Sequence, residues 1–149
     1  MVGLYWEEWE IGKSFQTAAR TVTETDIVNF AGISGDYNPL HINEEYCKTT
    51  QFGTRIAHGP LVYSIAAGLL FQLHLYDDTL IAFLGFESLK FTKPVKIGDT
   101  IYAKVVVTEL TETSKQDRGV MKRQLNVINQ HGDIVQDAIQ AFLMKRKPV

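Results

Sequence analysis

Two side chains that can exchange protons, Asp36 and His41, lie in the segment GDYNPLH of residues 35–41. A carboxylate and an imidazole that share one water could take a proton from it and return a proton to a neighbouring carbon atom. Proline fixes its own φ, and Pro39 also favours an extended conformation at Asn38. The segment is therefore predicted to direct both side chains into one pocket, with Asn38 as a supporting residue.

A second segment, HGP of residues 58–60, could bind negative charge. Pro60 suits the first turn of a helix, where N–H groups lack acceptors and the helix dipole places partial positive charge. Gly59 has no side chain, so a substrate oxygen could approach its N–H closely. We expect Gly59 to bind an oxygen that becomes negative during a reaction, and His58 to support the loop.

Two helices are predicted to position these groups. Thr23 can cap a helix that continues through apolar residues at helical spacing to Ser34, and Gly35 is a natural terminator. A second, strongly apolar helix is predicted from Pro60 to about Leu75. Residues 36–59, between the two helices, are predicted to be irregular with one helical turn near residues 44–46. The first half of the chain is thus predicted to be helical.

The second half of the chain shows the alternation that is typical of strands. Strands are predicted at residues 83–91, 101–108, 120–129 and 134–145, with turns at 98–99, 117–119 and 129–133. The last strand is apolar on both faces, which indicates cover on both sides, as from a partner subunit. The pattern predicts an α+β fold in which a long antiparallel sheet wraps around one buried helix, forming a single domain over residues 1–149.

The composition excludes several classes of function. Hydrophobic residues make up 45% of the 149 residues and the formal charge is −2, so no basic excess favours nucleic acid. Cys47 is the only cysteine, which excludes an intrachain disulfide and favours a cytoplasmic location. Acidic residues near the N-terminus are unlike a secretory signal. Residues 56–76 lack charge, but His, Gly, Pro, Ser and Gln interrupt the apolar runs, so no membrane span is expected.

With these segments in view, the sequence resembles a known family. The resemblance covers residues 30–41, 56–61, 68–70, 84–91, 94–95 and 98–99. The sequence is similar to the MaoC-like, (R)-specific enoyl-CoA hydratases, which have the hot-dog fold. This implies a fatty-acid-metabolism enzyme, a hydro-lyase that reversibly adds water to trans-2-enoyl-CoA to give the (R)-3-hydroxyacyl thioester. Asp36 and His41 correspond to the catalytic pair of the family, and Gly59 to its N–H donor.

The resemblance also has implications for cofactors and partners, and this sequence differs from some family members at one position of the central helix. Coenzyme A is part of the substrate and no further cofactor is implied, and a homodimer or higher homo-oligomer is expected. In some members of the family a serine on the central helix supports the catalytic aspartate. Ala67 occupies that position here, and Ser64 is the nearest hydroxyl that could take over the supporting role.

Other functions remain open at this point. A hot-dog thioesterase would use a carboxylate on or beside the central helix, and residues 60–76 contain none. A dehydratase of acyl-carrier-protein substrates would share the chemistry, and basic side chains could meet phosphate in either case: Arg55, Lys90, Lys93 and Lys96. A non-catalytic acyl-thioester binder is the third alternative. Chain-length preference depends on which side chains line the tunnel, and the sequence does not place the candidates for this role: Leu61, Tyr63, Ile65, Phe83 and Phe86.

No metal site is expected from the sequence. The spacing of His41 and Glu44 could place two ligands on one helical face, but no second pair of ligands has helical spacing. His74 and His131 lie near a helix end and in a turn, where a functional role is not expected.

Overall fold

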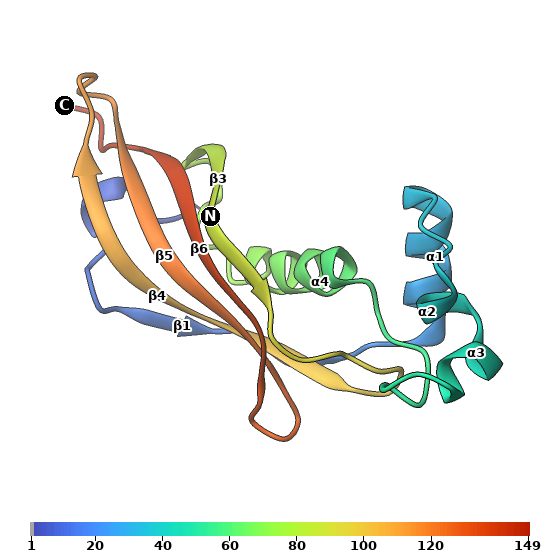
Figure 1. Ribbon diagram of the computed structural model, residues 1–149. Helices are drawn as coiled ribbons and strands as arrows, with labels where there is room; N and C mark the ends of the chain where they lie inside the picture. Colours follow the sequence, from blue (N-terminus) through green and yellow to red (C-terminus); the bar gives the residue numbers. More distant parts are fainter. Residues whose placement is uncertain (1) are drawn as a thin grey trace.

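The computed structural model describes residues 2–149 (Figure 1). The chain begins with a short 3₁₀ helix, η1, followed by two short strands, three helices, a fourth helix and four long strands. The elements are η1 (Trp6–Glu8), β1 (Ser14–Gln16), β2 (Arg20–Thr21), α1 (Glu24–Ser34), α2 (Pro39–Ile42), α3 (Glu44–Lys48), α4 (Gly59–Phe71), β3 (Leu80–Phe91), β4 (Thr100–Glu112), β5 (Arg118–Asn129) and β6 (Ile134–Lys145).

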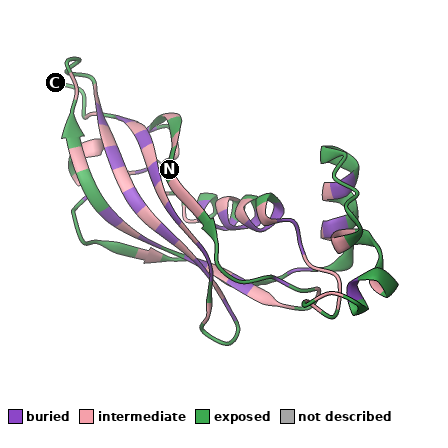
Figure 2. Ribbon diagram, viewed as in Figure 1, coloured by how far each residue is buried: buried purple, intermediate pink, exposed green. Residues whose placement is uncertain are grey.

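All six strands form one antiparallel sheet in the order β1-β4-β5-β6-β3, with β2 also pairing with β4. The sheet curves over α4 (Figure 1). Buried residues alternate with half-buried ones along β5 and β6, as expected for strands that turn one face to a core (Figure 2). Strand β3 occupies one edge of the sheet, so one of its sides has no neighbour in the described chain.

Helix α4 supplies the core that the sheet covers. Six side chains of α4 are buried against the sheet and form most of the inner face of the helix: Leu61, Val62, Ile65, Ala66, Leu69 and Leu70. The sheet thus wraps around the predicted central helix, whose outer face is exposed in the isolated chain at Pro60, Ser64, Gly68 and Phe71. Within residues 2–149, no helix has both the length and the apolar character that crossing a membrane requires.

Helices α1, α2 and α3 form a helical lobe, residues 24–48, at one end of the sheet (Figure 1). Thr23 caps α1 through a reciprocal pair of hydrogen bonds with Asp26, and Gly35 ends the helix at φ 76°. The Arg55 guanidinium bonds to Glu24 at the start of α1 and to Glu44 at the start of α3. This arginine therefore joins the first and last helices of the lobe.

The structure confirms the predicted first helix and the four long strands, and it corrects three expectations. Residues 36–59 contain two short helices, α2 and α3, instead of one turn. The first half of the chain also contains β1 and β2, which pair with β4. Helix α4 ends at Phe71 instead of near Leu75, and the chain then passes through a left-handed residue, His74, at φ 56°.

Candidate active site

The Asn38-Pro39 pair orders the segment that carries the two candidate catalytic residues. The Asn38 side chain accepts a hydrogen bond from the Leu40 N–H at 3.0 Å and caps α2. The Asn38 N–H in turn donates to the Asp36 carboxylate at 3.2 Å. Asn38 has φ −55° and ψ 135°, the extended conformation expected before a proline. The Asn38 side chain thus caps α2, and its backbone N–H contacts the Asp36 carboxylate.

His41 and Asp36 approach each other across a gap that suits a water molecule. The His41 Nδ1 lies 2.7 Å from the Ile56 carbonyl oxygen, which can only accept, so Nδ1 carries the proton and Nε2 is left with a lone pair. Nε2 lies 3.9 Å from Asp36 Oδ2, too far for a direct hydrogen bond. A water between them could donate one proton to each. The His41 side chain is 11% exposed and that of Asp36 is 52% exposed.

His58 contacts both candidate catalytic residues. Its ring is buried, and its Nε2 lies 2.9 Å from the Asp36 carbonyl oxygen. The same ring stacks on His41 with centroids 3.7 Å apart and packs against Phe30 at 4.9 Å. His58 therefore contacts the backbone of Asp36 and the ring of His41.

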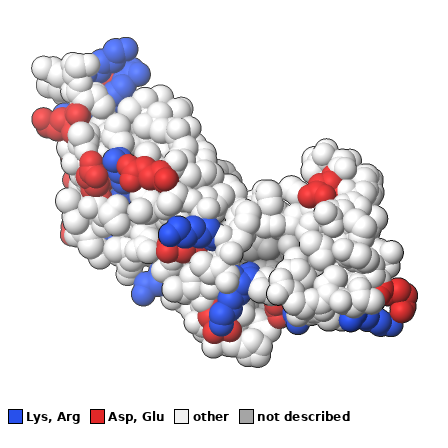
Figure 3. Space-filling view, in the orientation of Figure 1, with Lys and Arg blue, Asp and Glu red and all other residues white. Residues whose placement is uncertain are grey.

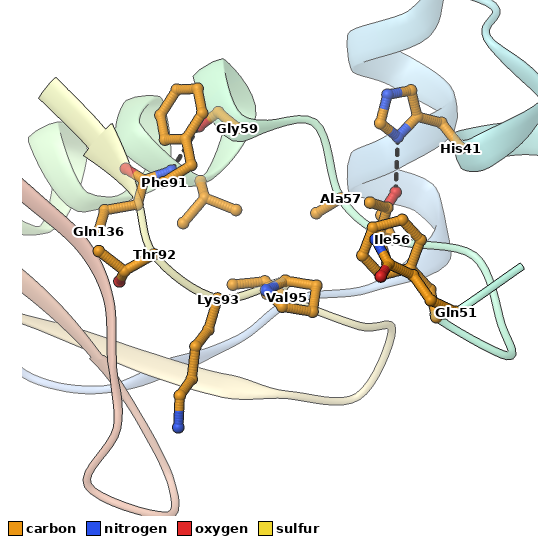
Figure 4. Close-up of a pocket in the computed structure, with 13 residues that line it drawn as sticks. His41, Gln51, Ile56, Ala57, Gly59, Phe91, Thr92, Lys93, Val95 and Gln136 are labelled. Atoms are coloured by element: carbon orange, nitrogen blue, oxygen red, sulfur yellow. Dashed lines mark hydrogen bonds between the residues drawn. The ribbon is translucent and has the colours of Figure 1, made fainter.

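A pocket of about 560 Å³ brings His41 and Gly59 onto common walls (Figure 4). Gly59 is the first residue of α4, so its N–H has no acceptor within the helix. Its carbonyl accepts a hydrogen bond from Gln136 Nε2 of β6 at 2.7 Å. A Cβ at this position would lie 2.5 Å from the ring of Phe91, so only glycine fits beside that ring without a shift. The start of α4 thus faces the cavity that His41 also lines.

Three potential metal ligands, Asp36, His41 and His58, have donor atoms within 4.8 Å of one another. An imidazole binds a metal through a lone pair in the plane of its ring. The planes of His41 and His58 lie face to face with an interplanar angle of 24°, so one ion cannot lie in both planes at bonding distance. The cluster fits a shared water better than a metal ion.

Ser64 does not take the supporting role expected from the sequence. Its hydroxyl donates to the Pro60 carbonyl at 2.8 Å, on the exposed face of α4, and not to Asp36. Three contacts of the site were missed: the Ile56 carbonyl on His41, Gln136 on Gly59, and the Phe91 ring against Gly59. The Ile56 and Gly59 groups that accept these hydrogen bonds are backbone carbonyls, and Phe91 of β3 is far from Gly59 in the sequence. No sequence motif could therefore indicate these contacts.

Charged side chains of both signs are interspersed on the face of the molecule seen in Figure 3, with no extended basic surface there. Near the site, Lys93 lines the pocket and lies 3.0 Å from Asp133. Arg55 is held by the carboxylates of the helical lobe. Of the basic residues that the sequence suggested for phosphate binding, Lys93 therefore lines the pocket, whereas Arg55 forms ion pairs with carboxylates of the helical lobe.

Comparison with known proteins agrees with this geometry. The family model described as "MaoC like domain" matches residues 7–130. The chain belongs to the MaoC-like family. The sheet wrapped around α4 in this MaoC-like protein is the hot-dog fold that the resemblance implied.

Named relatives indicate the type of reaction. The MaoC-like protein is 43% identical over 111 residues to an (R)-specific enoyl-CoA hydratase from Rhodospirillum rubrum, and the aligned region covers 74% of each chain. It is 35% identical over 116 residues to a 3-hydroxybutyryl-CoA dehydratase from Methylorubrum extorquens, covering 77% of this chain and 71% of that one. Both relatives are named as hydro-lyases, so the MaoC-like protein is an enzyme of this type.

A solved structure extends the similarity to the whole chain. The structure from Archaeoglobus fulgius, named a monoamine oxidase regulatory protein, is 40% identical and superposes with a TM-score of 0.93. The alignment covers 99% of the MaoC-like protein and 98% of that chain. The helical lobe and the sheet of the MaoC-like protein are therefore both part of a shared architecture.

Proposed function

We propose that the protein reversibly adds water to trans-2-enoyl-CoA and forms the (R)-3-hydroxyacyl-CoA. The observation that carries the proposal is the 3.9 Å gap between His41 Nε2 and Asp36 Oδ2. His41 lines a pocket together with Gly59, whereas Asp36 lies outside the lining of that pocket and reaches it only through the gap to His41. The hydratase and dehydratase names of the relatives support the same reaction class.

The geometry accounts for each step of the addition. A water that donates its two protons to Asp36 and His41 keeps an oxygen lone pair for attack on the β-carbon of the enoyl group. One O–H bond breaks as the new C–O bond forms, and the group that receives the proton then protonates the α-carbon. Because both atoms arrive from the same side, the addition is syn. Since neither group is a strong base, positioning contributes much of the rate.

The thioester oxygen gains negative charge while the α-carbon awaits its proton. In this proposal the Gly59 N–H stabilises that charge, aided by the dipole of α4. The peptide that carries this N–H is held through the His58 carbonyl, which accepts a hydrogen bond from the Val62 N–H at 3.1 Å, and Gln136 holds the next peptide through the Gly59 carbonyl. Coenzyme A enters as part of the substrate, and the steps use only side chains, backbone and water.

The proposed enzyme is a cytoplasmic homodimer. Two features support a second copy as the partner: the unpaired edge of β3, and exposed apolar side chains along that strand, such as Leu84 at 52%. A sheet edge of this kind pairs readily with another strand.

Replacement of Asp36 by Asn tests the mechanism. Asn keeps an oxygen for the bond from the Asn38 N–H but cannot accept a proton, so the hydration rate should fall by roughly 100-fold or more. The loss of enoyl-CoA absorbance measures the rate, and chiral analysis identifies the (R)-3-hydroxyacyl product. Asp78→Asn, in an exposed turn at positive φ that Asn tolerates, is the matched control.

Full activity in Asp36→Asn would rule out this mechanism. Release of free thiol in place of hydration would indicate a thioesterase. Equal or better turnover of the same acyl group on an acyl carrier protein would indicate the carrier-protein dehydratase, and binding without turnover would indicate an acyl-thioester binder.

A further inference from the structure

Arg123, at the centre of β5, is a buried cation that the proposed mechanism does not use. The residue is 2% exposed and faces the same side of the sheet as α4. Within residues 2–149, no carboxylate lies within 4.0 Å of its guanidinium, in contrast to the salt-bridged Arg20, Arg55, Arg118 and Arg146. Buried charges in proteins are normally paired, because their removal from water is costly. This arginine therefore lacks the anion that its position calls for.

Neutral groups surround the guanidinium. Its Nε donates to Gln140 Oε1 at 2.9 Å and its Nη1 donates to the Tyr76 hydroxyl at 3.2 Å. It also lies over the rings of Phe142 and Tyr76, at 4.5 and 5.4 Å from their centroids. These contacts lessen the cost of burial but leave the net charge in place.

Gln140 links Arg123 to Tyr63 of α4 through two hydrogen bonds. Its oxygen accepts from Arg123, and its Nε2 donates to the Tyr63 hydroxyl at 3.1 Å. The Tyr63 oxygen is therefore an acceptor in this chain of bonds, and its own proton has no acceptor among the described residues. A chain of polarised hydrogen bonds that starts at a cation strengthens the last donor. The chain thus ends in a half-buried O–H donor that suits an anionic oxygen.

Tyr63 lies further along α4 from the proposed oxyanion site, beyond the residues that line the pocket at Gly59. It lies one turn after Gly59 on the same face of α4, roughly 6 Å along the helix. Near Gly59, β3 and β6 contribute the paired residues Phe91 and Gln136. Near Tyr63, they contribute the paired residues Phe86 and Gln140, and the Phe86 ring packs edge-on against Tyr63 at 4.9 Å. An acyl chain that leaves the Gly59 amide along this strip reaches the Tyr63 hydroxyl after a few carbons.

We propose that the Tyr63 hydroxyl, backed by Gln140 and Arg123, binds a second carboxylate at the far end of the acyl group. The inference rests on the proposed hydration reaction and names its substrate class: short trans-2-enoyl-CoA thioesters that end in a carboxylate. Phe86 and Phe91 give the strip apolar walls, while its end carries the uncompensated positive charge. An acyl group with a methyl end would leave the Tyr63 donor and the Arg123 charge without a partner.

Two substrates of equal length test the proposal. Glutaconyl-CoA and trans-2-pentenoyl-CoA both have five-carbon acyl chains, and they differ in ending with a carboxylate or a methyl group. We expect kcat/KM for hydration to be at least about tenfold higher for glutaconyl-CoA, as for one hydrogen bond to a charged group. Equal or better hydration of trans-2-pentenoyl-CoA would overturn the proposal.

Two variants connect that preference to the residues. Tyr63→Phe removes only the hydroxyl, and Arg123→Met removes the charge while it keeps an unbranched chain; both should bring the ratio of the two kcat/KM values close to one. Tyr102→Phe, on the opposite face of the sheet, is the matched control and should keep the wild-type ratio. If Arg123→Met does not fold, Tyr63→Phe decides, and an unchanged ratio in that variant would contradict the proposal.

A binding measurement separates this proposal from the hydration reaction. Calorimetry with the saturated thioesters glutaryl-CoA and pentanoyl-CoA should give at least about tenfold tighter binding of glutaryl-CoA, and Tyr63→Phe should remove the difference. That result without hydration of either enoyl-CoA would refute the reaction and support the carboxylate site. Equal binding of the two saturated thioesters would refute the site even if hydration is observed.

Discussion

His58 acts on the proposed chemistry without lining the pocket. Its Nε2 holds the Asp36 carbonyl at 2.9 Å, and its ring lies 3.7 Å from that of His41. One buried side chain thus fixes the backbone of one candidate catalytic residue and the ring of the other. We assign it as a positioning residue.

Replacement of His58 by Phe keeps an aromatic ring for the stack but removes the donor to Asp36. We expect kcat to fall by roughly tenfold or more, because small displacements of a catalytic group are costly. The free energy of unfolding should change by less than about 1 kcal/mol, since the lost hydrogen bond is offset by removal of the buried, unpartnered Nδ1. Steady-state kinetics and chemical denaturation measure the two effects.

His131→Phe, in an exposed turn, is the control for the loss of an imidazole and should leave kcat unchanged. Wild-type kcat in His58→Phe would show that the segment of Asp36 holds its position without this hydrogen bond.

The sequence could indicate the groups of the site that lie close together along the chain. Asp36, Asn38 and His41 share one short segment, and their hydrogen bonds follow from the conformational limits that proline imposes. The contacts from His58 to the Asp36 carbonyl and from Gln136 to the Gly59 carbonyl span 22 and 77 residues. Such contacts depend on the tertiary fold, so a single sequence carries no local signal for them.

At the level of elements, the helical lobe depends on an ionic clamp at its base. Hydrogen bonds from the Thr54 hydroxyl and the Arg55 guanidinium lower the pKa of Glu44 below its ordinary value of 4.5. The same guanidinium bonds to Glu24 at the start of α1. The clamp therefore joins the two ends of the lobe that carries Asp36 and His41.

Replacement of Arg55 by Gln should lower the melting temperature by a few degrees near neutral pH. Because the folded pKa of Glu44 lies below its unfolded value, the clamp stabilises the fold above the unfolded pKa and loses this effect as the pH falls through the folded value. The difference in melting temperature between wild type and Arg55→Gln should thus shrink below about pH 4. Calorimetric scans over a pH series measure it.

Arg118→Gln provides the comparison, since Arg118 pairs with Asp117, its neighbour in the chain, and joins no separate elements. Its effect on the melting temperature should be smaller. A difference for Arg55→Gln that stays constant from neutral to acidic pH would contradict an electrostatic clamp.

The elements that the sequence predicted well are those with complete local signals. The first helix has a cap at Thr23 and a terminator at Gly35, and β4, β5 and β6 are long enough for alternation to show. Strands β1 and β2 have three and two residues, too few for any period. Helix α4 ends at Phe71 although apolar residues continue to Leu75, because those residues pack in the turn before β3.

At the scale of the whole molecule, the isolated chain leaves apolar surface along β3 and on the outer face of α4. Leu84 is 52% exposed and Phe71 is 59% exposed. Half-buried apolar residues on the outer face of β6, such as Ile139 and Leu143, fit the sequence-based expectation of cover by a partner. A homodimer that pairs through β3 would cover the apolar side chains along that edge.

Gel filtration with light scattering should show twice the mass of one chain for the wild-type protein. Leu84→Lys places a charge on the β3 edge and should shift the protein toward the monomer, since charged edge residues oppose strand pairing. Ile11→Lys, at a residue that is 65% exposed in a turn, is the control and should stay dimeric. A wild-type protein that is monomeric at all concentrations would refute the homodimer.

The irregularities of β3 bear on how far such pairing can extend. The register between β3 and β6 shifts between Leu80 and Ala82, between Phe83 and Gly85, and between Phe86 and Ser88. Each bulge bends the strand and interrupts its row of free N–H and C=O groups. The bulges should therefore limit strand pairing at this edge to short runs, which favours a closed pair of chains over an open-ended fibril.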